Sequence, residues 1–153
     1  MRNVLSLIAA AMLACGPALA EDLADPEEIL TARHGYMLMM AMNLAPLGAM
    51  AKGEVPYDAV AAGRAASSLA ALASVDSSML WVPGTENGVL DDSSALPEII
   101  SNADDRAVKF AALNTASDAM ATAAGTDLAS LQGAMKGVGE ACSGCHKPYR
   151  KSE

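Results

Sequence analysis

The chain has 153 residues, of which 52% are hydrophobic and only 3% are aromatic, and its formal net charge is −8. This length allows a single domain. The acidic charge argues against nucleic acid or an anionic membrane as a partner.

The N-terminal segment predicts a cleavable secretory leader. Arg2 precedes an apolar run that ends in an A-x-A site at residues 18–20. A lipid anchor at Cys15 fits less well, because the residues before it are poor for a lipid-attachment site. We expect residues 1–20 to be removed and residues 21–153 to be exported as a soluble domain. Loss of Arg2 leaves 9 basic against 18 acidic residues, a net charge of −9.

The first predicted helix begins near Asp25, which can cap it, with Pro26 at its first position. Its inward residues recur at alternating spacings of 3 and 4, as in a helical bundle. This seam consists of Leu30, Arg33, Met37, Met40, Leu44 and Leu47. Pro46 is expected to bend the helix, and Gly53 to end it.

Three more helices are predicted. The second covers about residues 56–76 and the third about residues 97–125. Residues 77–96, rich in Gly, Pro, Asp and Ser, are predicted to be irregular. The fourth helix begins near Thr126 and has the clearest seam. Its members are Leu128, Leu131, Met135, Val138, Cys142, Cys145 and Tyr149.

These elements predict an all-α fold, an up-down-up-down antiparallel four-helix bundle. The core of this bundle is short of large side chains, because aromatic residues are few and alanine occupies many inward positions of the second and third helices. A large apolar prosthetic group enclosed by the helices would fill that deficit.

Cys142, Cys145 and His146 form a C-x-x-C-H array near the C-terminus. A structural zinc site needs four ligands, and the other histidine, His34, lies about 100° from the seam of the first helix. A thioredoxin-type redox pair expects a βαβ setting that the sequence lacks. A small disulfide would leave the histidine unexplained.

Covalent attachment of haem uses the same array. Each thiol adds to a vinyl group of the haem, and the next residue presents an imidazole to the iron. This interpretation explains the histidine, the export signal and the underfilled core together. We therefore predict one haem c per chain, thioether-linked to Cys142 and Cys145, with His146 as the proximal axial ligand of the iron.

With this array in place, the chain resembles the class II cytochromes c, whose cytochrome c′ branch is itself a standard example of the bundle predicted above. The resemblance covers nearly all of residues 21–151. It rests on the segments CSGCHKPYR, ARHGYM, AKGEVPYDA and WVPGTENG, and on a C-x-x-C-H so close to the C-terminus.

The resemblance implies roles for three further residues. In the family, the residue four positions after an arginine of the first helix faces the iron opposite the histidine, and here that pair is Arg33 and Met37. Arg33 would contact a haem propionate, which agrees with the cost of an unpaired arginine on an inward seam, or its side chain would extend along the helix to reach solvent at the helix end. Arg150 would lie beside the proximal haem face, or serve only as a cation at a helix end. The helical rise places Met37 near the depth of His146 and Met40 about one turn too deep.

The function depends on whether Met37 bonds the iron. A His/Met ligand pair makes a low-spin electron carrier with a raised potential. An open iron would resemble the high-spin branch of the family, which binds nitric oxide and carbon monoxide. Both branches can have methionine at this position, and we favour ligation and electron transport. An enzyme is not expected, because the iron-facing seams carry no Asp, Glu or further His to act as acid or base.

The resemblance also implies a bacterial periplasm. The expected partners there are redox proteins with a basic docking patch, since the chain is acidic, or small gas ligands. Although the chain as a whole is acidic, a local cluster of basic residues is expected around the haem end. Its members are Lys136, Lys147, Arg150 and Lys151. A homodimer through the first two helices is compatible with the outward position of Met42.

Overall fold

The computed structural model describes residues 25–152, and within this range every named element is helical. The predicted leader, residues 1–20, lies outside the described residues. The elements in chain order are α1 (Pro26–Lys52), α2 (Ala59–Ala73), the short 3₁₀ turn η2 (Ser78–Leu80), α3 (Glu98–Ser101), α4 (Ala103–Ala123) and α5 (Leu128–Tyr149).

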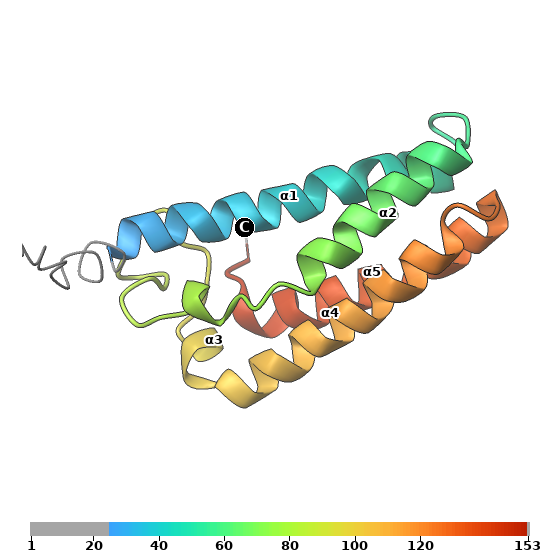
Figure 1. Cartoon of the computed structure of the whole chain (residues 1–153). Coiled ribbons are helices and arrows are strands. Elements are labelled where there is room, and N and C mark those ends of the chain that lie inside the picture. The colour runs from blue at the N-terminus through green and yellow to red at the C-terminus, as the bar shows by residue number, and fades with distance from the viewer. Residues whose placement is uncertain (1–24, 153) are drawn as a thin grey trace, which may run out of the picture.

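The four long helices alternate in direction along the chain (Figure 1). α1 packs against α2 and α5, and α4 packs against the same two helices, so the four form a closed ring. This arrangement confirms the predicted up-down-up-down bundle. The first half of α1, the end of α5 and the connection between α2 and α4 lie at the same end of the bundle (Figure 1).

Capping residues set most helix ends. The side chain of Asp25 accepts the backbone N–H of Glu27, and Gly53 ends α1 in the left-handed conformation with φ 75°. Both features match the sequence prediction. α2 begins at Ala59, three residues later than predicted, because Asp58 caps it by accepting two backbone N–H groups.

The third predicted helix is wrong in one respect, since the structure divides it into α3 and α4. Asn102 separates them with φ −100° and ψ 56°, outside the helical region. Its backbone N–H donates to the carbonyl of Glu98, and its carbonyl accepts the N–H of Arg106. The one residue therefore ends α3 and begins α4, and both of its own backbone groups keep a hydrogen bond at the turn.

The core largely follows the predicted seams. Its largest fully buried apolar side chains are Leu47, Leu69, Met120, Leu131 and Val138. Tyr36 is also buried, beside the predicted seam of α1, and its hydroxyl donates to the carbonyl of Leu72 at 3.0 Å. Leu128 was placed inward from the sequence, but it is 36% exposed at the start of α5. Small alanines fill much of the space between α1, α2 and α4.

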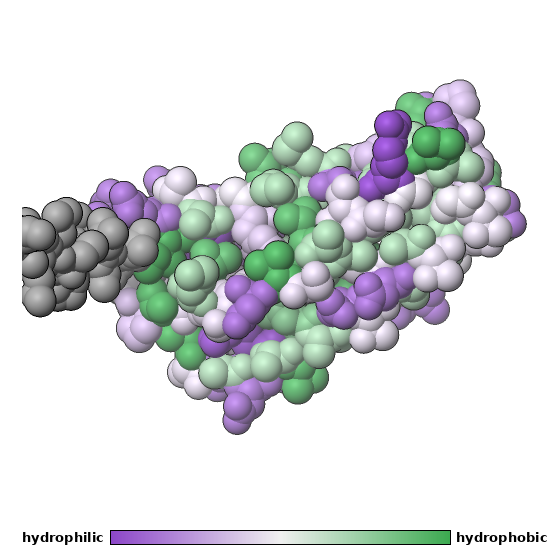
Figure 2. All heavy atoms as spheres, viewed as in Figure 1, coloured by the Kyte–Doolittle hydropathy of each residue, from purple (hydrophilic) through white to green (hydrophobic). Residues whose placement is uncertain are grey.

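The face of the molecule seen in Figure 2 mixes apolar and hydrophilic residues. Several large apolar side chains are exposed singly on different elements, among them Met42, Val60, Met79 and Val108. The outward position predicted for Met42 is confirmed. Among residues 25–152, no helix combines the length and hydropathy that a bilayer-crossing segment needs.

Candidate functional site

A cavity of about 540 Å³ lies between α1, α4 and α5 and is bordered at one end by residues 93–95. This volume falls within the roughly 300–1,000 Å³ of pockets that hold cofactor-sized ligands. Most of the described residues that line the cavity are apolar, and none of them carries a carboxylate. The shortage of large core side chains that the sequence predicted therefore corresponds to a cavity at this place in the bundle.

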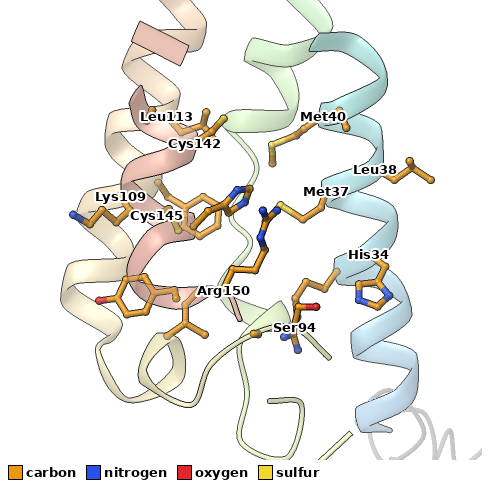
Figure 3. A pocket seen from close by; sticks show the side chains of 18 of the residues that line it. His34, Met37, Leu38, Met40, Ser94, Lys109, Leu113, Cys142, Cys145 and Arg150 are labelled. Carbon is orange, nitrogen blue, oxygen red and sulfur yellow. The ribbon is translucent and has the colours of Figure 1, made fainter. Parts of the chain in front are cut away.

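α5 brings Cys142 and Cys145 to the same wall of the cavity, because residues three apart share one helical face. Figure 3 shows both side chains turned toward α1. Neither cysteine forms a disulfide. Burial raises the pKa of both thiols, and for Cys145 the positive charge of Lys109 opposes this effect. The two thiols are thus neutral, adjacent to each other and directed at a single ligand volume.

His146 also lines the cavity and is only partly exposed. Burial, and to a smaller extent the positive charge of Arg150, lowers the pKa of the imidazole. A lowered pKa favours the neutral ring, whose free nitrogen lone pair is the form that binds metals. The surroundings of His146 therefore favour the form of the ring that a metal ligand needs. Among residues 25–152 no three His, Cys, Asp or Glu side chains gather as a metal-ion site, so the zinc interpretation lacks its further ligands.

The end of α5 is tied to the connection that precedes α3. The backbone N–H of Leu96 donates to the carbonyl of Tyr149, and the N–H of Lys151 donates to the carbonyl of Ser94, each at 2.9 Å. Arg150 lies between these two bonds, and its side chain extends into the cavity (Figure 3). Its expected position beside His146 agrees with its effect on the pKa of that residue.

α1 contributes the opposite wall through Met37 and Met40. Figure 3 shows Met37 at about the level of Cys145, and Met40 at about the level of Cys142, one turn deeper. This register agrees with the count made along the helix. Met37 is partly exposed and Met40 is buried, so the two sulfur atoms lie in different surroundings.

Arg33 is buried at the cavity wall, with 4% of its surface exposed. Its Nη2 donates to the carbonyl of Thr85 at 3.0 Å, but Nε and Nη1 have no partner. The guanidinium lies 4.9 Å from the ring centroid of Trp81. Burial lowers the pKa of Arg33, and the negative charge of Glu86 opposes this. A buried, incompletely bonded cation of this kind requires an anion.

The connection between α2 and α3 is ordered around Thr85. Its carbonyl accepts both Arg33 Nη2 and the hydroxyl of Ser93, the latter at 2.8 Å. The side-chain amide of Asn87 donates to the carbonyl of Ser93 at 2.7 Å. These bonds hold residues 81–95 against α1 and fix the position of Arg33 at the cavity.

Several lining residues were not singled out from the sequence as site residues, and three of them have large side chains. Trp81 comes from the irregular connection, where it begins the WVPGTENG segment, and Lys109 and Phe110 come from α4, where no motif distinguishes them. Because the chain has a single tryptophan, Trp81 could have been considered as a site residue from the sequence. His34, expected on a flank, is exposed and reaches the edge of the cavity.

The predicted cluster of basic residues at the haem end is partly wrong. Lys136 lies ten residues before His146, about 15 Å along α5, and its 81% exposed side chain pairs with Glu140 at 3.8 Å. It therefore belongs to the helix surface and not to the haem end. Lys109 of α4 takes its place at the cavity.

These residues fit a covalently bound haem. The cavity has a suitable volume, apolar walls, two adjacent thiols and a neutral imidazole on one side, a thioether on the other, and an arginine without an anion. A haem has parts that such features could accommodate: an apolar macrocycle, vinyl carbons that react with thiols, an iron that takes axial ligands, and anionic propionates.

Comparison with known proteins agrees with this fit. The family model described as Cytochrome C′ matches residues 28–150. The chain belongs to the cytochrome c′ family. Cytochrome c-554 of Cereibacter sphaeroides is 48% identical over 153 residues, which is 100% of both chains. A solved cytochrome c′ from Rhodobacter is 39% identical with a TM-score of 0.82, over 85% of this chain and 100% of that chain.

A third relative is known with bound gas. The cytochrome c′ of Alcaligenes xylosoxidans, in a ferrous variant with bound NO, is 30% identical with a TM-score of 0.73, over 85% of this chain and 98% of that chain. Another cytochrome c′ among the matches is described by a ligand-controlled dimer dissociation. Members of the cytochrome c′ family bind covalently attached haem c with its iron and are typically periplasmic. The predicted cofactor is thus confirmed.

Proposed function

We propose that this cytochrome c′ family protein is a single-electron carrier of the bacterial periplasm. Cys142 and Cys145 hold the haem through two thioether bonds. His146 and Met37 are the axial ligands of its iron. When bound, this haem supplies a one-electron ferric/ferrous couple, and a thioether opposite an imidazole raises its potential.

The observation that carries this proposal is the position of Met37. Its side chain lies on the wall opposite α5 and at the level of Cys145, the residue directly before His146 (Figure 3). A soft thioether is a good ligand for haem iron, and a ligand on each side leaves no open coordination position. Electron transfer then requires no bond to be made or broken at the iron.

The surrounding residues support this role in three ways. Leu44, Leu69 and Val138 line the cavity with aliphatic carbon, which excludes water and favours the less charged ferrous state. Arg33 balances a propionate inside the bundle. The carbonyl of His146 accepts the backbone N–H of Arg150, the residue that caps the end of α5, and this bond limits the movement of the histidine.

The second candidate function is gas binding at an open iron. It is favoured by the solved Alcaligenes relative, which is described with bound NO, and by further structures of that protein with NO or carbon monoxide. Met37 would then pack over the iron without bonding it, and an incoming diatomic molecule would displace it. Both candidates use the same haem, the same thioether bonds and the same proximal histidine.

We propose redox proteins with a basic docking patch as the partners of the carrier, because the chain carries 18 acidic against 10 basic residues. Pairing of two copies through α1 and α2 remains a second proposal. We also propose that the protein is not an enzyme, since no carboxylate is present among the described lining residues to act as an acid or base.

The test is an optical spectrum of the haem-loaded protein, oxidised and reduced, with and without carbon monoxide. We expect a low-spin wild type that carbon monoxide does not change, and a high-spin, gas-binding Met37→Ala variant. Met40→Ala is the matched control, because it removes the same side chain one turn away and should leave the spectrum low-spin. A high-spin wild type that binds carbon monoxide at once would refute Met37 ligation and favour the second candidate.

A further inference from the structure

Two side chains that line the cavity carry three buried hydrogen-bond donors without a partner. They are Nε and Nη1 of Arg33 and Nε1 of Trp81. The two side chains are in contact, since the guanidinium carbon lies 4.9 Å from the indole centroid, and both line the cavity. Only 7% of Trp81 and 4% of Arg33 is exposed, so bulk water does not satisfy these groups.

We propose that Trp81 is a second hydrogen-bond donor to the haem propionate that Arg33 binds. The indole N–H and the guanidinium together form a site for one buried carboxylate. The inference rests on the seating of the haem in this cavity, and it gives Trp81 a positioning role that the sequence analysis did not assign.

The energy of leaving these donors unpaired favours such a site. An unsatisfied buried donor costs about 1 to 3 kcal/mol, and more when it is charged. A carboxylate has two oxygen atoms with about four lone pairs, so one carboxylate can accept both the guanidinium and the indole N–H. A charge-assisted bond to a propionate is also roughly twice as strong as a neutral one.

No carboxylate of the described chain takes this position. Glu86 is the acidic residue whose charge acts on Arg33, but its Oε2 accepts the backbone N–H of Gly84 at 2.8 Å. None of the ion pairs found among residues 25–152 includes Arg33. The anion that completes this site is therefore not among the described residues, and the propionates are the anionic groups of the haem.

Trp81 is held firmly enough to orient the haem. Its backbone N–H donates to the carbonyl of Ser78 at 3.2 Å, directly after η2. Its ring packs on Phe110 with centroids 5.8 Å apart and planes inclined by 54°. Ile99 and Tyr149 complete the same apolar cluster. With the ring fixed by α4 and α5, its N–H has one direction and selects one orientation of the propionate.

The chain has a single tryptophan, so its indole N–H gives one resonance that needs no assignment. We would label the haem-loaded protein with ¹⁵N and record it in the ferrous state with carbon monoxide added. An iron ligated by methionine and an iron that binds carbon monoxide are both low-spin and diamagnetic when ferrous. The experiment therefore works whichever candidate function is correct, and failure of the electron-carrier proposal is detected separately by the optical spectrum.

We expect a nuclear Overhauser effect between the Nε1 proton and the methylene protons of one propionate, and exchange of that proton with D₂O at least tenfold slower than in a solvated indole. An Nε1 proton that exchanges freely and shows no effect to the propionate would overturn the proposal.

Trp81→Phe provides a second measurement, because it keeps an aromatic ring and removes the donor. The midpoint potential should fall, since a less stabilised propionate favours the more positive ferric iron. Phe110→Leu is the control, as it loosens the packing of the indole but leaves its N–H in place. Equal shifts in the two variants would mean that packing alone is responsible and would also overturn the proposal.

Discussion

Preventing haem attachment tests how much of this fold depends on the group in the cavity. The perturbation is the double substitution Cys142→Ala and Cys145→Ala, expressed and purified without haem. The walls of the cavity come from α1, α4, α5 and the connection between α2 and α3. Loss of the haem therefore removes contacts from most of the bundle at once, and not from one helix.

The cavity volume sets the size of the effect. A cavity costs about 24 cal/mol per Å³, so 540 Å³ corresponds to about 13 kcal/mol. This is an upper value, because an open cavity can partly collapse. Even half of it is comparable with the whole stability of a typical domain, about 5 to 15 kcal/mol. We therefore expect the haem-free chain to keep much of its helix but to lose fixed packing.

Circular dichroism measures both properties. The far-ultraviolet signal should remain largely helical, while the near-ultraviolet signal of Trp81 and the cooperative thermal transition should disappear. Ser143→Ala is the control, because it lies between the two cysteines but keeps both thiols and should bind haem and unfold cooperatively. A haem-free chain that melts cooperatively within about 5 °C of the haem-loaded protein, roughly 1 to 2 kcal/mol, would refute the reasoning.

Two further predictions concern stability. Burial and a 2.6 Å hydrogen bond to Asp105 raise the pKa of Tyr149, the hydrogen bond more strongly. The stability that this hydroxyl contributes is therefore complete below its unfolded pKa of about 10 and is lost as the pH rises through the folded pKa. In denaturant titrations, the difference in free energy of unfolding between the wild type and Tyr149→Phe should shrink over that pH range. A difference that does not change with pH would contradict the assignment. Gly53→Ala should destabilise the protein by about 1 to 2 kcal/mol, because φ at Gly53 is 75°. Gly35→Ala lies inside α1 with open space around it and should instead stabilise the protein by about 0.5 to 1 kcal/mol. If thermal melts show that both substitutions stabilise, or that both destabilise, backbone conformation does not decide the outcome.

The parts of the fold that could be predicted rest on local signals. α1 was placed correctly because a capping residue, a proline and a terminal glycine mark its ends, and its seam repeats over many turns. The outlines of α5 and its C-x-x-C-H array followed from the same regularity. The break at Asn102 was missed, because an asparagine within a helical pattern does not distinguish a helix interior from a corner between two helices.

Part of the candidate site could likewise be predicted from local signals, and part could not. Cys142, Cys145 and His146 are close in the sequence, so their shared wall followed from helical spacing alone. Met37 could be given a depth by counting turns, although the sequence does not say whether its sulfur bonds the iron. The place of Trp81 at the site was not predicted from the WVPGTENG segment, because it depends on contact with Arg33, which is 48 residues earlier in the chain.

The sequence by itself determined the helices, the covalent attachment points of the haem and the need for a large group in an alanine-rich core, because these depend on spacing along one segment and on composition. Only the tertiary structure decided where Arg33 finds its partner at Thr85, 52 residues away, and which side chains of α4 complete the cavity. The physical reason is that burial and hydrogen-bond satisfaction depend on segments far apart in the chain, and their relative positions exist only once the bundle has formed.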